Sequence, residues 1–315
     1  MLKFMKAENC DLNAIRFPVV CLVKIDGVNG GNLSDRFTSR TLKPFKNSVV
    51  GDVFSHPLLR GFNGELTVGS LTDGATCRRT TSVVNSYSWN TDGFCPTLYP
   101  FDYVTEQTQK FKFTDRYHLL RGLIDKLPPE LAQFVKPLPA VKLCKTLEEV
   151  LEFHEMVTGL GYEGTILRWH LAPHKNGRST VKEGYMLRLK DQETDEAIVL
   201  SLVEAEENQN IAQINELGET FRTSHQENKV GKGMVGSFIC LWNGIEISVS
   251  AGTLDHDERR EIWELTFEER KELWEMRKDA RPKVAVGDTI QFRYMKYGMK
   301  DKPRHARYVA PREDL

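Results

Sequence analysis

Residues 23–31, VKIDGVNGG, place a lysine at the end of an apolar run and follow it with an acid and a glycine-rich turn. Lys24 could be an ordinary surface charge or a nucleophile held at the end of a strand. A nucleophilic lysine must lose its proton, which requires poor solvation, neighbouring cations or a metal ion. An attack on a nucleotide phosphate also requires cations that neutralise the developing charge. Lys-x-Asp-Gly alone decides nothing, so the rest of the chain must supply these groups.

Side chains that could assist such a lysine follow in order along the chain. They are Arg40 in a Thr-Ser-Arg sequence, the carboxylates of Glu65 and Glu163, Phe101 beside Asp102, and the cations Arg188 and Lys190. Arginine binds phosphate through paired hydrogen bonds, and an aromatic ring can stack on a base. Two cations spaced two residues apart in a strand point to the same face. Taken singly, the acids could be exposed and the phenylalanine could belong to the core. Only their joint order favours a catalytic site.

The chain resembles the ATP-dependent DNA ligases, in particular the minimal ligases of large DNA viruses and phages. The segments that carry the resemblance are KIDG, SRTLKPFKN, FNGEL, FDYV, YEGTILR, GRSTVKEGYMLRLK and GSFICLWNGIEISVSAG. It extends from about residue 16 to Arg312. The resemblance implies an α+β protein, with a nucleotidyltransferase (ATP-grasp-like adenylation) domain at 1–191 and a small OB-fold β-barrel domain at 192–315. It also implies a DNA-clasping loop at about 206–229.

The resemblance implies that Lys24 attacks the α-phosphate of ATP and holds AMP as a phosphoramidate. AMP then passes to the 5′-phosphate at a nick, and the 3′-hydroxyl displaces AMP. The implied catalytic residues are Lys24, Asp26, Arg188 and Lys190. The implied nucleotide-binding residues are Leu22, Ile25, Asn29, Arg40, Glu65, Phe101, Arg188, Lys190 and Arg312.

The implied metal is Mg²⁺, for which Mn²⁺ would substitute, held by Glu163 and Glu65. The implied macromolecular partner is nicked double-stranded DNA. The residues expected to contact it are Ser39, Arg40, Lys175, Arg178 and Arg222. Contacts of basic side chains with the DNA backbone depend on salt and are independent of sequence.

Three positions depart from the family pattern. Asn29 stands where the family has an arginine that helps to hold the AMP ribose, and asparagine is shorter and uncharged. Leu22 replaces a polar residue that commonly meets the adenine amino group, so only the Leu22 backbone could make this contact. Arg188 replaces a lysine and keeps the charge in a different geometry. We expect altered nucleotide affinity with the chemistry retained.

The elements that must position these side chains give a mixed α and β first part and a β-rich second part. Strands are predicted at Phe17–Val23, Gly64–Val68, Leu98–Val104, Tyr162–Trp169 and Tyr185–Lys190. Helices are predicted at Asp115–Leu127, with Leu119, Leu120, Leu123 and Ile124 on one face, and from a capping box at Thr146 to about Thr158.

Later strands are predicted at Ala197–Val203, Met234–Trp242, Ile245–Ala251, Thr289–Tyr294 and Arg307–Ala310. Asn243-Gly244 predicts a type I′ hairpin, and Thr266–Glu269 is a second capping box. Residues 204–232 are polar without clear periodicity, which indicates a functional or disordered loop. Residues 191–196, DQETDE, are expected to be a hinge between the domains.

Composition supports a soluble chain without metal-binding cysteines. The net charge is −1, and no apolar run approaches the roughly 20 residues of a membrane span. The six cysteines form no C-x-x-C pair, so a zinc ribbon and disulfides are not expected. The N-terminus has no segment typical of a signal peptide. We expect a cytoplasmic monomer that does not associate with membranes.

Two other functions share parts of this pattern. An RNA ligase or an mRNA capping guanylyltransferase would use the same lysine, whereas SRTLKPFKN and the OB segment favour a DNA ligase. A nucleic-acid-binding protein that has lost catalysis would not need Lys24, Glu65, Glu163 and Lys190 together.

Overall fold

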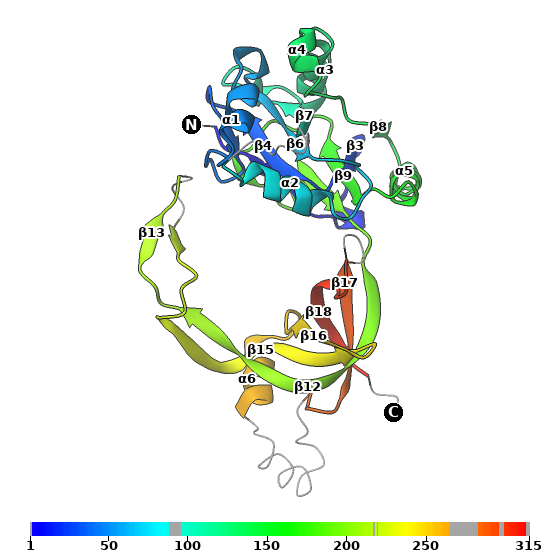
Figure 1. Cartoon of the computed structure of the whole chain (residues 1–315). Helices are drawn as coiled ribbons and strands as arrows, with labels where there is room; N and C mark the ends of the chain where they lie inside the picture. The colour runs from blue at the N-terminus through cyan, green and yellow to red at the C-terminus, as the bar shows by residue number, and fades with distance from the viewer. Residues whose placement is uncertain are drawn as a thin grey trace, which may run out of the picture. The chain divides into compact units, whose positions relative to one another are not determined.

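The computed structural model describes residues 2–87, 96–216, 218, 220–264, 283–295 and 299–312. Figure 1 shows that the chain forms two compact units. The first comprises Met1–Lys190 with Glu216–Gly218, and the second comprises Asp191–Asn215 with Glu219–Leu315. Each unit has its own hydrophobic core, so each is described by itself.

A five-stranded sheet in the first unit carries the lysine of interest. In spatial order its strands are β2 (Glu8–Asn9), β11 (Met186–Leu189), β9 (Gly164–Trp169), β3 (Val19–Lys24) and β8 (Val141–Cys144). β3 is antiparallel to both β8 and β9, and every residue of it is buried except Lys24. β-branched residues are typical of strands, and in β3 the side chains on both faces are buried in the core.

A four-stranded antiparallel sheet lies beside it in the same unit. Its order is β5 (Phe37–Ser39), β4 (Val28–Asn32), β6 (Phe62–Thr67) and β7 (Thr97–Tyr103). A short parallel pair, β1 (Met5–Lys6) with β10 (Gly177–Arg178), ties the N-terminal segment to the loop before β11. The strands predicted near Lys24, Glu65, Phe101, Glu163 and Arg188 are confirmed to within three residues at each end.

Five helices accompany these sheets in the described part of the unit. They are α1 (Ser48–Phe54), α2 (Thr76–Val84), α3 (Phe113–Ile124), α4 (Pro129–Ala132) and α5 (Leu147–Gly159). The 3₁₀ turns are η1 (Leu12–Ala14), η2 (Pro57–Leu59) and η3 (Thr108–Lys110). The capping box at α5 is confirmed, because Thr146 Oγ1 accepts a hydrogen bond from the Glu149 backbone N–H at 3.3 Å.

The predicted apolar face of α3 was wrong at one position. Leu120 and Ile124 are buried, but Leu119 is 44% exposed. The buried stripe instead runs through Phe113, Arg116, Leu120 and Ile124. These positions keep the helical spacing, so the error came from expecting leucine rather than arginine in the stripe.

The second unit is a closed five-stranded barrel, which confirms the OB-type prediction. The barrel order is β12 (Glu193–Asn208), β15 (Lys229–Trp242), β16 (Ile245–Ser250), β18 (Arg304–Pro311) and β17 (Thr289–Met295), and helix α6 (His256–Glu264) packs on β15. Asn243 and Gly244 both have positive φ, 49° and 75°, as a type I′ hairpin requires.

The described residues within 204–232 form a β-ribbon, so of the two predicted alternatives, a functional or a disordered loop, the disordered one is wrong. β12 and β15 extend through much of this stretch, and β13 (Ala212–Ile214) pairs with β14 (Thr220–Arg222). All six residues of β13 and β14 are exposed. Because neither face of such a ribbon is buried, its sequence has no apolar alternation to reveal the strands. The expected hinge at 191–196 also belongs to β12 from Glu193 onward.

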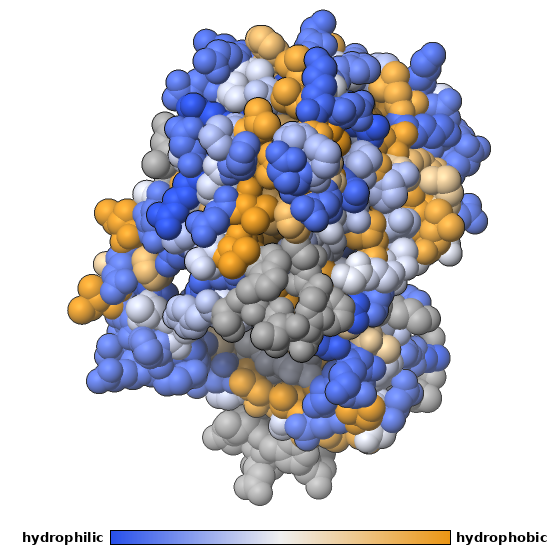
Figure 2. All heavy atoms as spheres, turned by 45° about the horizontal axis from the view of Figure 1, so that its top comes forward, coloured by the Kyte–Doolittle hydropathy of each residue, from blue (hydrophilic) through white to orange (hydrophobic). Residues whose placement is uncertain are grey.

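Other sequence predictions have mixed outcomes. The described cysteines are free thiols, and Cys95 lies outside the described residues. The capping box at Thr266–Glu269 also lies outside them. No helix in the described ranges is long and apolar enough to cross a membrane. On the face shown in Figure 2, hydrophobic side chains form several separate groups among hydrophilic ones.

Candidate active site

Lys24 ends β3, where the buried strand meets a turn that only glycine can make. Its side chain is 20% exposed, whereas the five strand residues before it are buried. Gly27 follows closely, and a Cβ atom there would lie 2.2 Å from the Leu66 carbonyl oxygen. The Lys-x-Asp-Gly sequence therefore needs glycine for close packing against β6.

Glu163 joins Lys24 to Lys190. The Nζ atom of Lys24 donates to Oε2 of this carboxylate, and the Nζ atom of Lys190 donates to Oε1. Gly164, directly after Glu163, pairs with Lys24 in the sheet, and this register sets the contact. We call these three residues the lysine cluster. The carboxylate is 3% exposed and the two lysines about a fifth exposed.

Burial and neighbouring charge set the proton affinities in the lysine cluster. Burial lowers the pKa of Lys190, and the positive charge of Lys24 lowers it further. Burial alone would raise the pKa of Glu163, but the two lysines outweigh burial and hold this pKa below its ordinary value. Glu163 is therefore a carboxylate at neutral pH, able to hold a cation.

Glu65 and Asn29 face one another on β6 and β4 next to this cluster. The two residues are paired in the sheet register, and Asn29 Nδ2 donates to the Gly64 carbonyl oxygen at 3.0 Å. Burial raises the pKa of Glu65 to about 7. The charge of Lys24 opposes this shift, while Glu163 and Asp26 add to it, so these groups lie within electrostatic range of one another.

Phe101 is half-buried on β7 and packs against the same core as β3. The side chains of Leu22 and Ile25 are almost fully buried in that core. β3 pairs with a strand on each side of Leu22. The contact between the Leu22 backbone and adenine stays a prediction.

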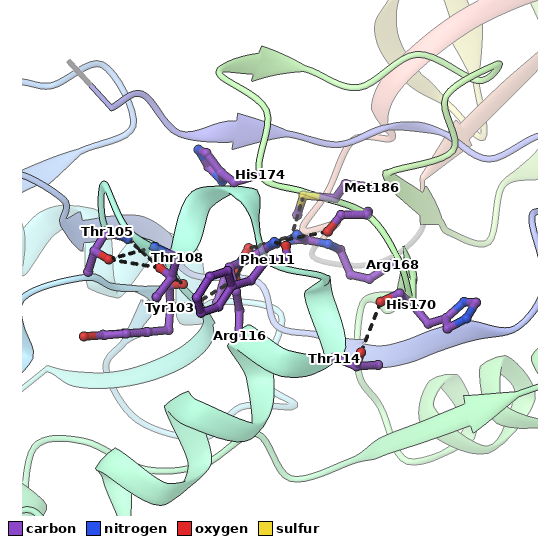
Figure 3. A network of polar contacts seen from close by, with 12 residues as sticks. Tyr103, Thr105, Thr108, Phe111, Thr114, Arg116, Arg168, His170, His174 and Met186 are labelled. Carbon is purple, nitrogen blue, oxygen red and sulfur yellow. Dashed lines mark hydrogen bonds and ion pairs between the residues drawn. The ribbon is translucent and has the colours of Figure 1, made fainter.

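A second ionic group, which we call the arginine cluster, consists of Asp102, Arg116 and Arg168, all fully buried. Figure 3 shows Arg116 and Arg168 within this network of polar contacts. Asp102 accepts hydrogen bonds from Arg116 Nε at 2.8 Å and Nη2 at 3.1 Å, and from Arg168 Nη2 at 2.8 Å. Arg116 also donates to the carbonyl oxygens of Phe111 and Ala172. The cluster thus connects β7, α3 and β9.

The arginine cluster keeps its charges despite burial. Burial would raise the pKa of Asp102, but the two arginines hold it well below its usual range. Burial lowers the pKa of Arg168 to about 10, so this side chain stays charged at neutral pH. Sequence reasoning did not find Arg116. Its signal was present, because an arginine occupies the helical spacing of the buried stripe in α3.

Several predicted DNA-contacting and phosphate-contacting residues bind other protein groups in the structure. Lys175 Nζ donates to both carboxylate oxygens of Glu183 at 2.8 and 2.7 Å. Arg178 donates to the Ala7 carbonyl oxygen at 2.7 Å, and Arg222 to that of Asn210. Their guanidinium and ammonium groups are thus partly satisfied within the protein.

The remaining predicted site residues lie on different elements. Arg312 forms an ion pair with Glu196 in the second unit. Ser39 ends β5 and shares a hydrogen bond with Thr41, and Arg40 is exposed in the turn that follows. Arg188 Nε donates to Asn9 Oδ1 at 2.8 Å. The structure therefore groups Lys24, Asp26, Glu65, Glu163 and Lys190, with Asn29 opposite Glu65 and Arg188 within electrostatic range of Lys190.

Glu163 and Glu65 fit a magnesium ion only together with substrate oxygens. Among the described residues, no group of three or more His, Cys, Asp or Glu side chains could hold a metal ion. Mg²⁺ is commonly held by one or two carboxylates, with phosphates and water completing the octahedron. Two carboxylates within electrostatic range of each other suit that arrangement.

Comparisons with known proteins show a family match in the second unit and similar solved structures over the whole chain. Residues 228–312 match the family model described as DNA ligase OB-like domain. A solved structure of Chlorella virus DNA ligase-adenylate is 26% identical, with a TM-score of 0.53 over 99% of this chain and 100% of that chain. A Lig E DNA ligase, 21% identical, shares the fold with a TM-score of 0.66, covering 99% of this chain and 100% of that one. A sequence search of curated proteins finds no match.

These comparisons confirm the predicted fold class, a nucleotidyltransferase domain with an OB domain. The resemblance to minimal ATP-dependent DNA ligases is likewise confirmed, through the Chlorella virus enzyme and the Lig E fold.

Proposed function

We propose that this protein is an ATP-dependent DNA ligase that seals nicks between a 3′-hydroxyl and a 5′-phosphate through a lysine–AMP intermediate. The observation that carries the proposal is the lysine cluster, in which one buried carboxylate contacts Lys24 and Lys190. A buried carboxylate that positions the lysine, with a second cation nearby, supports amine attack on a phosphate.

The first step forms a bond between Lys24 Nζ and the α-phosphorus of ATP and breaks the bond to the β-phosphate oxygen, so pyrophosphate leaves. Before the attack Lys24 loses its ammonium proton to water, and Glu163, which contacts Nζ, keeps the amine in place. Lys190 and Arg188 neutralise the developing phosphate charge. AMP then moves to the 5′-phosphate of DNA, and the 3′-hydroxyl displaces AMP to form the phosphodiester.

Nucleotide binding would use the two sheets around Lys24. Phe101 stacks on adenine and Glu65 accepts from the ribose hydroxyls, with Leu22, Ile25 and Asn29 as neighbours. Glu163 and Glu65 would hold Mg²⁺, which would supply charge neutralisation for the reaction. When it binds, Glu163 must exchange a lysine contact for the metal, because both its oxygens accept from lysines here.

The DNA contacts and domain roles are further parts of the proposal. Ser39 and Arg40 contact the nick phosphate, and Lys175, Arg178 and Arg222 contact the backbone after exchanging their protein partners. Residues 206–229 clasp the duplex, and Arg312 orients pyrophosphate. Residues 1–191 and 192–315 act as the adenylation and OB domains of a monomer.

The test combines label transfer with sealing. The protein is incubated with Mg²⁺ and α-labelled ATP, GTP or adenylate-labelled NAD, and then with nicked duplex DNA or RNA. We expect labelling by ATP alone and sealing of DNA. Lys24→Ala should abolish both, while Lys142→Ala, a surface lysine paired with Glu152, should retain both. Labelling by GTP alone would indicate capping, sealing of RNA alone an RNA ligase, and absence of labelling a binding protein.

A further inference from the structure

The N-terminal segment forms part of the sheet that carries the candidate active site. β2 runs parallel to β11, with Asn9 paired to Arg188, and the Cys10 backbone N–H donates to the Arg188 carbonyl oxygen at 2.9 Å. Farther upstream, the Lys3 backbone N–H donates to Asn176 Oδ1 at 2.8 Å. The segment is thus attached at both ends, and one attachment meets a residue of the proposed reaction.

Asn9 contacts Arg188 at Nε, an atom that is not needed when phosphate binds to the two Nη groups. Its Oδ1 accepts from the guanidinium Nε at 2.8 Å. Within the described part of the chain, the two Nη atoms of Arg188 donate no hydrogen bond. A guanidinium held at Nε keeps one planar edge, formed by the Nη groups, for two parallel bonds to phosphate oxygens.

The hydrogen bond to Asn9 also matters because Arg188 lies near a second positive charge, that of Lys190. The positive charge of Arg188 lowers the pKa of Lys190, so the two cations are within electrostatic range. Like charges repel, and a flexible arginine side chain would turn toward solvent. A fixed acceptor on a paired strand opposes this motion and lowers the entropy lost when phosphate binds.

We propose that Asn9 is a positioning residue of the adenylylation site, which holds Arg188 through Nε so that its two Nη groups face the α-phosphate of ATP. The inference rests on the proposed function and adds to it a residue outside the motifs of the resemblance. Asn9 touches no reacting atom and acts only through Arg188.

The test is the rate of Lys24 labelling by α-labelled ATP in single turnover, at low and saturating ATP. Asn9→Ala should lower this rate about 3- to 10-fold, the range for the loss of one typical hydrogen bond, because the bond from Arg188 is exposed to solvent. Asn9→Asp, which still accepts from Nε, should stay within about twofold of wild type. Asn176→Ala is the matched control, because it removes another side-chain anchor of the segment without touching Arg188, and it should also stay within about twofold.

A double-mutant cycle separates positioning from a structural effect. In an Arg188→Ala background, Asn9→Ala should have no further effect on the rate. An equal fall in that background, or an unchanged rate in Asn9→Ala alone, would overturn the inference while leaving the ligase proposal intact. Absence of labelling in the wild type would instead remove the proposed function, and this inference with it.

Discussion

Two ionic clusters in the first unit have the same charges and differ in their surroundings. In each, one carboxylate lies between two cations: Glu163 between Lys24 and Lys190, and Asp102 between Arg116 and Arg168. Both involve β9 or the residue before it. The lysines are about a fifth exposed, whereas the arginine cluster is at most 1% exposed.

The difference assigns chemistry to one cluster and architecture to the other. Lysine can lose its proton when poorly solvated, and a partly exposed cluster admits a substrate. Arginine does not deprotonate at neutral pH, and its planar fork suits a permanent bond to a buried carboxylate. The arginine cluster would fix β7, and so Phe101, relative to β9. Neutralising Glu163 should therefore lower the rate of the reaction, whereas neutralising Asp102 should lower the stability of the fold.

The largest effect is expected in the lysine cluster. Glu163→Gln should lower the rate of Lys24 labelling on the order of 10²- to 10³-fold, because it removes the negative charge that positions Lys24 and Lys190 and would hold Mg²⁺. Its urea-unfolding free energy should change little. Glu155→Gln, on the exposed side of α5, is the control and should label normally. A Glu163→Gln protein that labels at near wild-type rate would break the comparison.

The arginine cluster should respond in stability. Asp102→Asn leaves two buried guanidinium groups without their counter-charge and should lower the free energy of unfolding by about 3–5 kcal/mol, measured by urea denaturation. Asp73→Asn, which breaks the exposed ion pair with Arg79, should have a much smaller effect. Equal stabilities of the two variants would show that burial does not distinguish the clusters.

Asn29 tests how the site binds nucleotide. Asn29→Arg should lower the apparent KM for ATP several-fold, roughly 1 kcal/mol, because a longer charged side chain opposite Glu65 could reach the ribose. The measurement is the ATP dependence of Lys24 labelling, and Asn29→Gln controls for length without charge. An unchanged or higher KM would contradict the prediction.

The smallest effect concerns Glu65 and pH. Its pKa is raised to about 7 from an ordinary 4.5, so between these values the folded protein holds a proton that the unfolded chain releases. Stability contributed by this group is therefore present below pH 4.5 and falls as pH rises to 7. Glu65→Gln should flatten this decline, by roughly 1 kcal/mol after allowing for solvent screening. An identical pH profile of unfolding in both proteins would refute it.

The sequence predicted those parts of the fold that have strong local signals. β3 follows from its β-branched run, α5 from its capping threonine, and the β15–β16 hairpin from Asn243-Gly244. The solvated ribbon at 204–232 has no buried face, so no periodicity revealed it.

The candidate site was predictable only where its motifs are contiguous. Lys24, Glu65, Glu163 and Lys190 were named from the sequence. Arg116 was missed because an arginine was not expected in the buried stripe of α3. Asn9 was missed because its partner, Arg188, lies 179 residues farther along the chain. A two-residue strand such as β2 is also too short to show any period.

The central claim is that Lys24 carries AMP. The most direct measurement is peptide mapping by mass spectrometry after incubation of the full chain with ATP and Mg²⁺, with and without pyrophosphate. We predict one AMP moiety on the peptide that contains Lys24, removed when pyrophosphate is added. An unmodified Lys24, or AMP on a different lysine, would contradict the account.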